Sequence, residues 1–459
     1  MTRSAGDEDP SLDEAVGRLD DAALRRLLVT AAAAHEDVSR AVRLAAADDS
    51  ERLAVLRAEV DRGLRTRRHL GYWESSAWAR DASPVVDALA EAAVAGPSAE
   101  LVLLLERAVG HLVKVILRAD DSDGLIGDLA RRVLDLHQMA CTAGVADPVT
   151  LARWMVRFTF DDQDFFVVDP VAYVDALGDK GLATYRKEVA KRSGPVEVTP
   201  LRRDLWDPFP SFAARYAAER LAVIDRDADR LIELLGGDLS SPHQFTWVAE
   251  AMVELGRDDD ALAWALRGIA ETNGWQVSEL YDLAARLLHD RNDIDAVLAL
   301  RREQHERVPS SSTYALLKTA ATARGTWESE RDAARSVLAR DPGGLVDALL
   351  TDGDTDEAWT VATAGGWEPD PRRWKRLAEA REASDPAGAL GVYLRLTDTV
   401  LVDANKGVYR DAVRHLKAAR RAANSAGLVR DFDEKLASLR EQHRRRPTFI
   451  AMLDKAGLR

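Results

Sequence analysis

Hydrophobic residues recur every three or four positions along most of the chain, which is the spacing of amphipathic α-helices. The clearest example has apolar positions at Leu101, Leu104, Leu105, Ala108, Leu112, Val115 and Ile116. The charged residues Glu106, Arg107 and Lys114 fall off that face. An earlier helix is predicted by the same spacing at Leu19, Leu24, Leu27, Leu28 and Ala31, and a second follows to about Ala47. The pattern predicts an all-α protein.

Prolines interrupt this pattern between Ser193 and Ser211, where Pro195, Pro200, Pro208 and Pro210 lie close together. A regular helix cannot run through such a segment, so the main domain boundary is placed there. The predicted organisation is a disordered tail at 1–10, an α-helical N-terminal domain at 11–195, a proline-rich linker at 196–211, helical repeats at 212–400 and a basic C-terminal helical cap at 401–459.

A local signature recurs beyond the linker. The segment ELGRDDDALAWALRGI around Ala261 is echoed 35 residues later by HDRNDIDAVLALRREQ around Ala296. Looser echoes are TDGDTDEAWTVA around Ala358 and ASDPAGALGVYLRL around Ala389, and the gap between Ala296 and Ala358 leaves room for a degenerate repeat at GTWESERDAARSVL. A period of about 34 residues is typical of tetratricopeptide arrays. We therefore expect a tetratricopeptide-like helix-pair solenoid, and by fold-level analogy a surface that binds another polypeptide.

Several longer segments resemble a bacterial family. They are GYWESSAWARDASPVVDAL, DDSDGLIGDLARRVLDLHQMAC, YVDALGDKGLATYRK, DPAGALGVYLRL, NKGVYRDAVRHLKAAR and LASLREQHRRRPTFIAMLDKAGL. From about Leu64 to Leu458 the chain is similar to the helical region of unknown function that often follows a SWIM-type zinc finger. That finger needs about four Cys and His ligands, and Cys141 is the sole cysteine here. The resemblance therefore implies a helical fold but neither zinc binding nor nucleic-acid binding.

Charge is unevenly distributed along the 459 residues. The net charge is −14, from 63 Lys and Arg against 77 Asp and Glu. Residues 401–459 carry 14 Lys and Arg against 7 Asp and Glu, a net +7, so residues 1–400 carry −21. The overall charge disfavours non-specific binding to nucleic acid or an anionic membrane. No secretory signal and no window of 18 uncharged apolar residues is present, so we expect a cytoplasmic protein with no membrane partner.

Three clusters invite a metal interpretation, and each has a simpler structural one. His137 and Cys141 are four residues apart on a predicted helix, but two ligands do not make a zinc site, so a buried packing pair is favoured. The segment from Asp120 to Gly124 lacks the ligand spacing of a calcium loop, so it predicts a turn followed by an aspartate that caps the next helix. The alternating aspartates Asp352, Asp354 and Asp356 resemble a calcium loop, but the Gly and Glu that such a loop requires at later positions are missing. Asp354 with Glu357 favours a helix cap.

No catalytic or nucleotide-binding motif is present: GxxxxGK[ST], GxGxxG after a strand, HExxH and GxSxG are all absent. We therefore expect no enzymatic activity, no cofactor and no metal.

A basic stripe is the strongest candidate for a binding surface. Lys406, Arg410, Arg414, Lys417 and Arg421 fall within about 80° on a helical wheel. Arg444, Arg445 and Arg446 extend the positive charge. Trp275 and Trp367 follow glycines at predicted turns and are candidates for exposure at a partner surface. The stripe could bind an acidic partner or a nucleic-acid backbone, or it could be a solvated face docked on the acidic body of the same chain.

Together these features predict a non-enzymatic cytoplasmic scaffold or adaptor that binds a protein partner through its helical repeats. The alternative is a nucleic-acid-associated accessory protein that uses the C-terminal stripe.

Overall fold

The computed structural model describes residues 16–35, 38–39, 42–43, 46, 49–163, 165–193 and 212–459, with the backbone alone for 49–51 and 162. These residues form helices and no strand; the one β-type contact among them is an isolated parallel bridge between Leu70 and Ala119. The all-α prediction is confirmed. The chain forms two compact units, residues 1–238 and 239–459. The predicted tail at 1–10 and linker at 196–211 lie outside the described residues.

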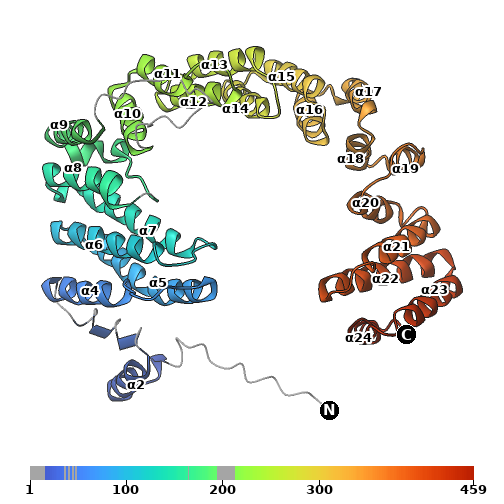
Figure 1. The fold of residues 1–459 in the computed structure, drawn as a ribbon, viewed down its shortest axis with the longest axis horizontal. Helices are drawn as coiled ribbons and strands as arrows, with labels where there is room; N and C mark the ends of the chain where they lie inside the picture. The colour runs from blue at the N-terminus through green and yellow to red at the C-terminus, as the bar shows by residue number, and fades with distance from the viewer. Residues whose placement is uncertain are drawn as a thin grey trace. The chain divides into compact units, whose positions relative to one another are not determined.

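The first unit contains these described α-helices: α2 (Asp21–Ala34), α4 (Asp49–Gly63), α5 (Tyr72–Ala95), α6 (Ala99–Ile116), α7 (Leu125–Ala140), α8 (Pro148–Arg157), α9 (Val174–Ser193), α10 (Phe212–Asp225) and α11 (Ala228–Gly236). Short π-helical turns, η1 (Cys141–Val145) and η2 (Phe158–Asp162), follow α7 and α8, and a 3₁₀ turn, η3 (Pro170–Tyr173), precedes α9. Figure 1 shows α4 to α9 of this unit as a succession of neighbouring helices.

Helix α6 forms as its hydrophobic pattern predicts. The Ser98 side chain caps its N-terminus by accepting from the Leu101 backbone N–H at 3.1 Å. All the predicted apolar positions are buried except Ile116, which is partly buried, while Arg107 and Lys114 are exposed. The buried face joins one core that extends from Leu56 on α4 to Ala217 on α10. The predicted helix near Leu24 also forms, as α2, but none of its residues is buried.

The first unit extends past the predicted linker. Helix α10 packs on α9 and contributes Ala217 to the core of this unit. Arg220 on α10 is 7% exposed and its Nε donates to the Asp169 carboxylate at 2.9 Å. These contacts place α10 and α11 with the N-terminal helices, whereas the sequence grouped them with the repeats.

The second unit contains these helices: α12 (Pro242–Glu254), α13 (Asp258–Glu271), α14 (Val277–Asp290), α15 (Ile294–Arg307), α16 (Ser311–Arg324), α17 (Trp327–Val337), α18 (Pro342–Asp352), α19 (Thr355–Thr363), α20 (Pro371–Arg381), α21 (Pro386–Val400), α22 (Lys406–Ala426), α23 (Val429–Gln442) and α24 (Pro447–Lys455). A 3₁₀ turn, η4 (Leu338–Arg340), follows α17. The substantial contacts join helices that are adjacent or next but one along the chain. Each helix therefore packs mainly against its neighbours in sequence.

A common turn joins many helices of both units. It contains one residue with φ between 54° and 85°, two positions before the next helix begins: Arg226, Gly256, Asn292, Gly325, Gly353 and Gly427. The following residue donates its N–H to the carbonyl five residues earlier, at 2.8–3.0 Å, which satisfies an end carbonyl of the preceding helix. The echoes around Ala261, Ala296 and Ala358 follow such turns, and the echo around Ala389 follows a turn at Asp385. Ala261, Ala358 and Ala389 are fully buried, so helices approach closely there.

Candidate functional site

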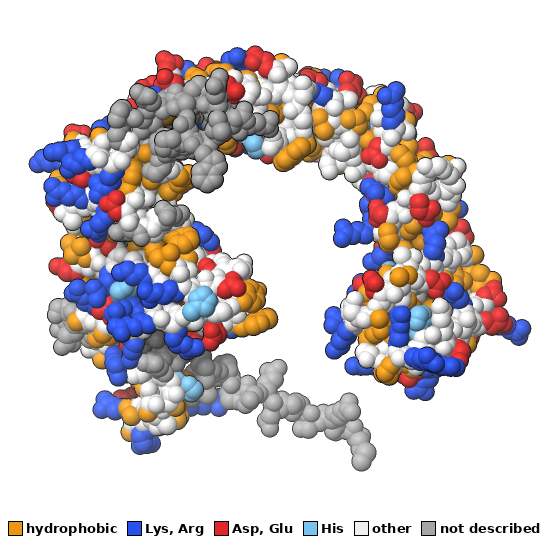
Figure 2. All heavy atoms as spheres, viewed as in Figure 1, with side chains coloured by type: hydrophobic (Ala, Val, Ile, Leu, Met, Phe, Trp, Pro, Cys, Tyr) orange, Lys and Arg blue, Asp and Glu red, His pale blue; other side chains and the backbone are white. Residues whose placement is uncertain are grey.

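The basic stripe lies on α22, the helix that follows the last sequence echo. The Asn405 side chain caps this helix by accepting from the Gly407 and Val408 N–H groups at 2.9 and 3.0 Å. Tyr409, Leu416 and Ala423 are buried, whereas all five cations of the stripe are exposed. The helical spacing thus separates an apolar face from a cationic one, and Figure 2 shows Lys and Arg side chains over the part of the unit that contains α22 to α24.

The cations of the stripe differ in their partners. Arg414 pairs with Asp411 at 3.0 Å, one turn away on the same helix, and Arg421 pairs with Glu382 at 3.3 Å. Among the residues that the structure describes, Lys406, Arg410 and Lys417 form no ion pair within 4 Å. These three are the cations of α22 that remain free to meet an acidic ligand.

The three arginines near the C-terminus do not form one surface. Arg446 is partly buried and donates to the carbonyl oxygens of Leu401 and Asp403 at 2.8 and 3.0 Å. Arg444 pairs with Glu441 on α23. Arg445 is exposed. Arg446 therefore ties the α21–α22 connection to the turn before α24 and has a structural role.

Charged groups from α20 approach α22. His415, next to Arg414 on α22, is 9% exposed. Burial, and then the positive charges of Lys375 on α20 and Arg414, lower the pKa of His415, against the opposing effect of Asp411. Since Glu382 at the end of α20 also accepts from the Tyr393 hydroxyl at 2.8 Å, its contact with Arg421 is part of a fixed connection between α20, α21 and α22.

The two predicted tryptophans lie in different environments. Trp275 is 75% exposed and follows Gly274, whose φ is 109°, in the turn before α14. The neighbouring Gln276 side chain is 2.8 Å from Nε2 of His243 on α12, and this contact fixes the turn. Trp367 is partly buried and packs against the core that spans α18 to α24. Trp275 therefore presents a large apolar surface to solvent, whereas Trp367 contributes to packing.

His137 and Cys141 are both fully buried in the first unit. His137 Nδ1 is 2.9 Å from the Tyr173 hydroxyl, its ring packs on Trp154 with centroids 4.3 Å apart, and its Nε2 is 3.7 Å from Glu106. Burial, together with the charge of Glu106, raises the pKa of the Cys141 thiol to about 12. The pair packs in the core, and its thiol is unreactive at neutral pH.

The aspartate clusters make intramolecular contacts. Gly124 has a φ of 74°, and the Asp121 carboxylate accepts from the N–H groups of Ile126 and Gly127 at 2.9 Å, so the predicted turn and helix cap are confirmed. Asp354 stands at the N-cap position of α19, as predicted, but its carboxylate makes no cap hydrogen bond and instead forms a charge-assisted contact with Arg335. Within the described residues there is no group of three or more His, Cys, Asp or Glu placed to hold a metal ion.

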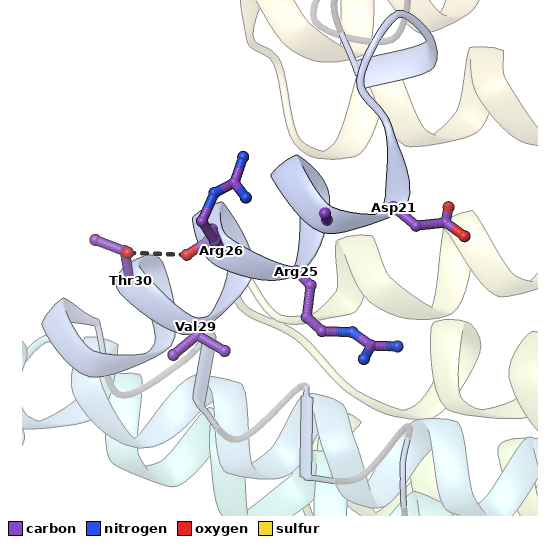
Figure 3. Close-up of a pocket in the computed structure, with 6 residues that line it drawn as sticks. Asp21, Arg25, Arg26, Val29 and Thr30 are labelled. Carbon is purple, nitrogen blue, oxygen red and sulfur yellow. Dashed lines mark hydrogen bonds between the residues drawn. The ribbon is translucent and has the colours of Figure 1, made fainter.

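Two pockets in the described part of the first unit bear on function. One is formed along α2 by Asp21, Ala22, Arg25, Arg26, Val29 and Thr30 (Figure 3). Its only hydrogen bond in that view, from the Thr30 hydroxyl to the Arg26 carbonyl, is internal to the helix. A second pocket, between α4 and α6, is strongly cationic and was missed by the sequence analysis. The sequence feature that indicates this pocket is the run of arginines from Arg62 to Arg68. It lies far in sequence from the residues of α6 that line the same pocket.

No helix in the described part of the chain is both long and apolar enough to cross a membrane. Comparison with protein-family models finds no match, and comparison with curated proteins finds no significant relative.

Proposed function

We propose that this chain is a non-enzymatic scaffold or adaptor of the cytoplasm, whose second unit binds a protein partner. The supporting observation is the packing of α12 to α24, in which helices contact their sequence neighbours and recurring left-handed turns join successive helices. This arrangement is typical of tetratricopeptide-like solenoids, whose long surfaces bind other polypeptides. The resemblance to the helical region that follows SWIM-type zinc fingers is compatible with this arrangement and suggests no enzymatic reaction.

The feature that carries the proposal is the cationic face of α22. Lys406, Arg410 and Lys417 are exposed at 4- and 7-residue spacing and form no ion pair with described residues. Like charges on one face repel each other, so an acidic ligand laid along the helix would relieve that repulsion. An acidic segment of a protein fits this face, and Trp275 offers an apolar anchor elsewhere on the same unit.

A nucleic-acid backbone is the alternative ligand for the stripe, through Lys406, Arg410, Arg414 and the Arg444 to Arg446 cluster. Three of these six cations are less available, since Arg446 binds backbone carbonyls, Arg444 pairs with Glu441 and Arg414 pairs with Asp411. The remaining positive surface is short for a duplex, whose affinity depends on many phosphate contacts.

The test is a set of charge reversals on the exposed face, K406E/R410E/R414E/K417E, in the full chain. Reversal should reduce partner capture about tenfold or more, because charge complementarity controls association and specificity. The matched control, R340E/R430E/K455E/R459E, changes the net charge equally at exposed cations outside the stripe. Substitution is preferred to deletion of 241–390, because the deletion would cut into α21 (Pro386–Val400), which packs extensively on α22.

Capture is measured by affinity purification of the tagged chain with and without nuclease, followed by mass spectrometry. A nuclease-resistant stoichiometric partner that the stripe variant loses and the control retains would support the proposal. Recovery of nuclease-sensitive material alone, with binding that falls steeply as salt rises, would support the nucleic-acid alternative. Equal capture by both variants would contradict a role for the stripe.

A further inference from the structure

The cationic pocket of the first unit lies between the end of α4 and the second half of α6. It has a volume of about 510 Å³ and is lined by Asp61, Arg62, Arg65, Thr66, Arg67, His111, Lys114, Val115 and Arg118. Five of these nine residues are Arg or Lys and one is a carboxylate. Figure 2 shows Lys and Arg side chains gathered over the part of the first unit where α4 and α6 lie.

The one carboxylate in the pocket is already neutralised. Asp61 accepts from Nε and a terminal nitrogen of Arg107 at 2.5 and 2.9 Å, and His111 Nε2 lies 3.0 Å from the same carboxylate. The Arg107 guanidinium holds the pKa of Asp61 well below its usual range. Burial lowers the pKa of His111, and the nearby charges of Arg107 and Arg65 act in the same direction. Asp61 therefore cannot balance the other cations of the pocket.

Arg62 pairs with Glu59 on α4, but the other four cations have few partners of their own. Arg65, Arg67 and Lys114 are exposed and form no ion pair with any residue that the structure describes. Arg118 donates one long hydrogen bond, 3.4 Å, to the Thr66 carbonyl, and its other nitrogens remain available. Lys114 favourably complements the C-terminal end of α6, but Arg65, Arg67 and Arg118 lie beyond the ends of their helices. Helix ends thus do not account for the convergence of these four cations.

The pocket is held in shape by the fold. The segment from Arg65 to His69 is anchored at both ends by buried residues, Leu64 at 0% and Leu70 at 3% exposure. The Leu70 N–H donates to the Arg118 carbonyl at 2.9 Å, and the Asp120 N–H donates to the Leu70 carbonyl at 2.8 Å. These bonds fix the arginine-bearing segment beside the exit of α6. A fixed backbone lowers the cost of ordering these side chains around an anion.

We propose that this pocket binds a small polyanion that carries two or more linked phosphate groups. Guanidinium groups bind phosphate oxygens through paired hydrogen bonds, and Lys114 supplies a point charge. The volume lies within the range of small-molecule sites, about 300–1,000 Å³, and exceeds what a single phosphate fills. No Phe, Tyr or Trp occurs among the described lining residues, so recognition rests on the phosphates.

Calorimetric titration of the full chain with pyrophosphate, tripolyphosphate and ATP at fixed ionic strength tests this proposal. Saturable one-to-one binding is expected, tighter for tripolyphosphate than for pyrophosphate and similar for ATP. The variant R65E/R67E/K114E should weaken binding by about a hundredfold or more, since each charge-assisted contact contributes about tenfold. The control R80E/R153E/K187E reverses three exposed cations of the same unit outside the pocket and should bind normally.

Three results would overturn the proposal. One is the absence of saturable binding of all three oligophosphates at low salt. Another is equal weakening in the pocket variant and its control, which would mean that net charge alone attracts the anions. The third is tight binding of single-stranded or duplex RNA, lost in R65E/R67E/K114E, without oligophosphate binding; the pocket would then belong to a nucleic-acid surface. Much tighter binding of ATP than of tripolyphosphate would support the phosphate site and show that it also contacts the nucleoside.

Discussion

Removal of the Asp352 carboxylate should loosen the middle of the second unit. Asp352, at the end of α18, has a side chain that is 5% exposed and accepts from Lys318 and Arg335 at 2.7 Å each. The Tyr314 hydroxyl donates to the same carboxylate. Arg335 also binds Asp354, so one network joins α16, α17, α18 and the turn before α19. Asp352→Ala removes the acceptor at its centre.

The cost follows from the burial of the donors left behind. Removal of one partner of a buried ion pair costs about 3–5 kcal/mol, because the other charge stays desolvated. The Lys318 side chain is 31% exposed and can regain water, and Arg335 keeps Asp354. These two features place the expected loss near the lower limit, about 3 kcal/mol, or a rise of about a hundredfold in local opening. Arg335→Ala should destabilise the Asp352→Ala variant less than it destabilises the unmodified chain, because the two residues are coupled.

Hydrogen exchange measured by mass spectrometry on the full chain reports this loss, since a chain of two units and many helices does not unfold in one step. Amides of α16 to α18 should exchange faster in Asp352→Ala, while those of the first unit and α22 to α24 should not. The control Asp332→Ala removes a carboxylate that is 90% exposed and 3.8 Å from Arg331, and should change opening by less than about 0.5 kcal/mol. Unchanged protection in α16 to α18, or a uniform loss throughout the chain, would refute the reasoning.

Four further outcomes are expected. Gly268→Ala should destabilise α12 to α14 by about 1–3 kcal/mol in the same exchange experiment, since a Cβ would lie 2.6 Å from that of Phe245; a gain in stability would contradict the close helix approach. Trp275→Ala should leave thermal stability unchanged, because the side chain is 75% exposed, but reduce partner capture. Iodoacetamide at pH 8 should label Cys141 only after unfolding in urea, since burial raises the pKa of its thiol to about 12. The midpoint of urea unfolding should fall as pH drops below about 6.5, because burial lowers the folded-state pKa of His305 and the unfolded chain then takes up the proton first. His305→Gln should reduce this pH dependence, and an unchanged profile would assign it to other groups.

Local structure could be predicted from the sequence because it depends on neighbours in the chain. The apolar stripe of α6 and the turn at Gly124 follow from helical spacing and from the freedom of glycine at positive φ. The echoes around Ala261, Ala358 and Ala389 mark helix starts for the same reason. The sequence missed that Arg226 and Asn292 adopt the same left-handed turn as the glycines, because residue type alone does not reveal it.

The partners of charged residues, by contrast, were decided by tertiary structure. Arg446 and Arg444 lie in one basic run, yet one binds backbone carbonyls 43 to 45 residues away and the other pairs three residues away. Asp354 has the spacing of a helix cap, but Arg335 from α17 takes its carboxylate.

The same holds for the candidate sites. By itself, the sequence determined an all-α chain with recurring helix starts and one cationic helix face, since periodicity and charge spacing are properties of a single helix. The cationic pocket needs Arg65 and Arg67 beside Lys114 and Arg118, about 50 residues further on. Buried Leu64 and Leu70 bring these groups together. Only packing between helices decides which cations converge and which are neutralised, because electrostatic interactions depend on distance in space rather than in sequence.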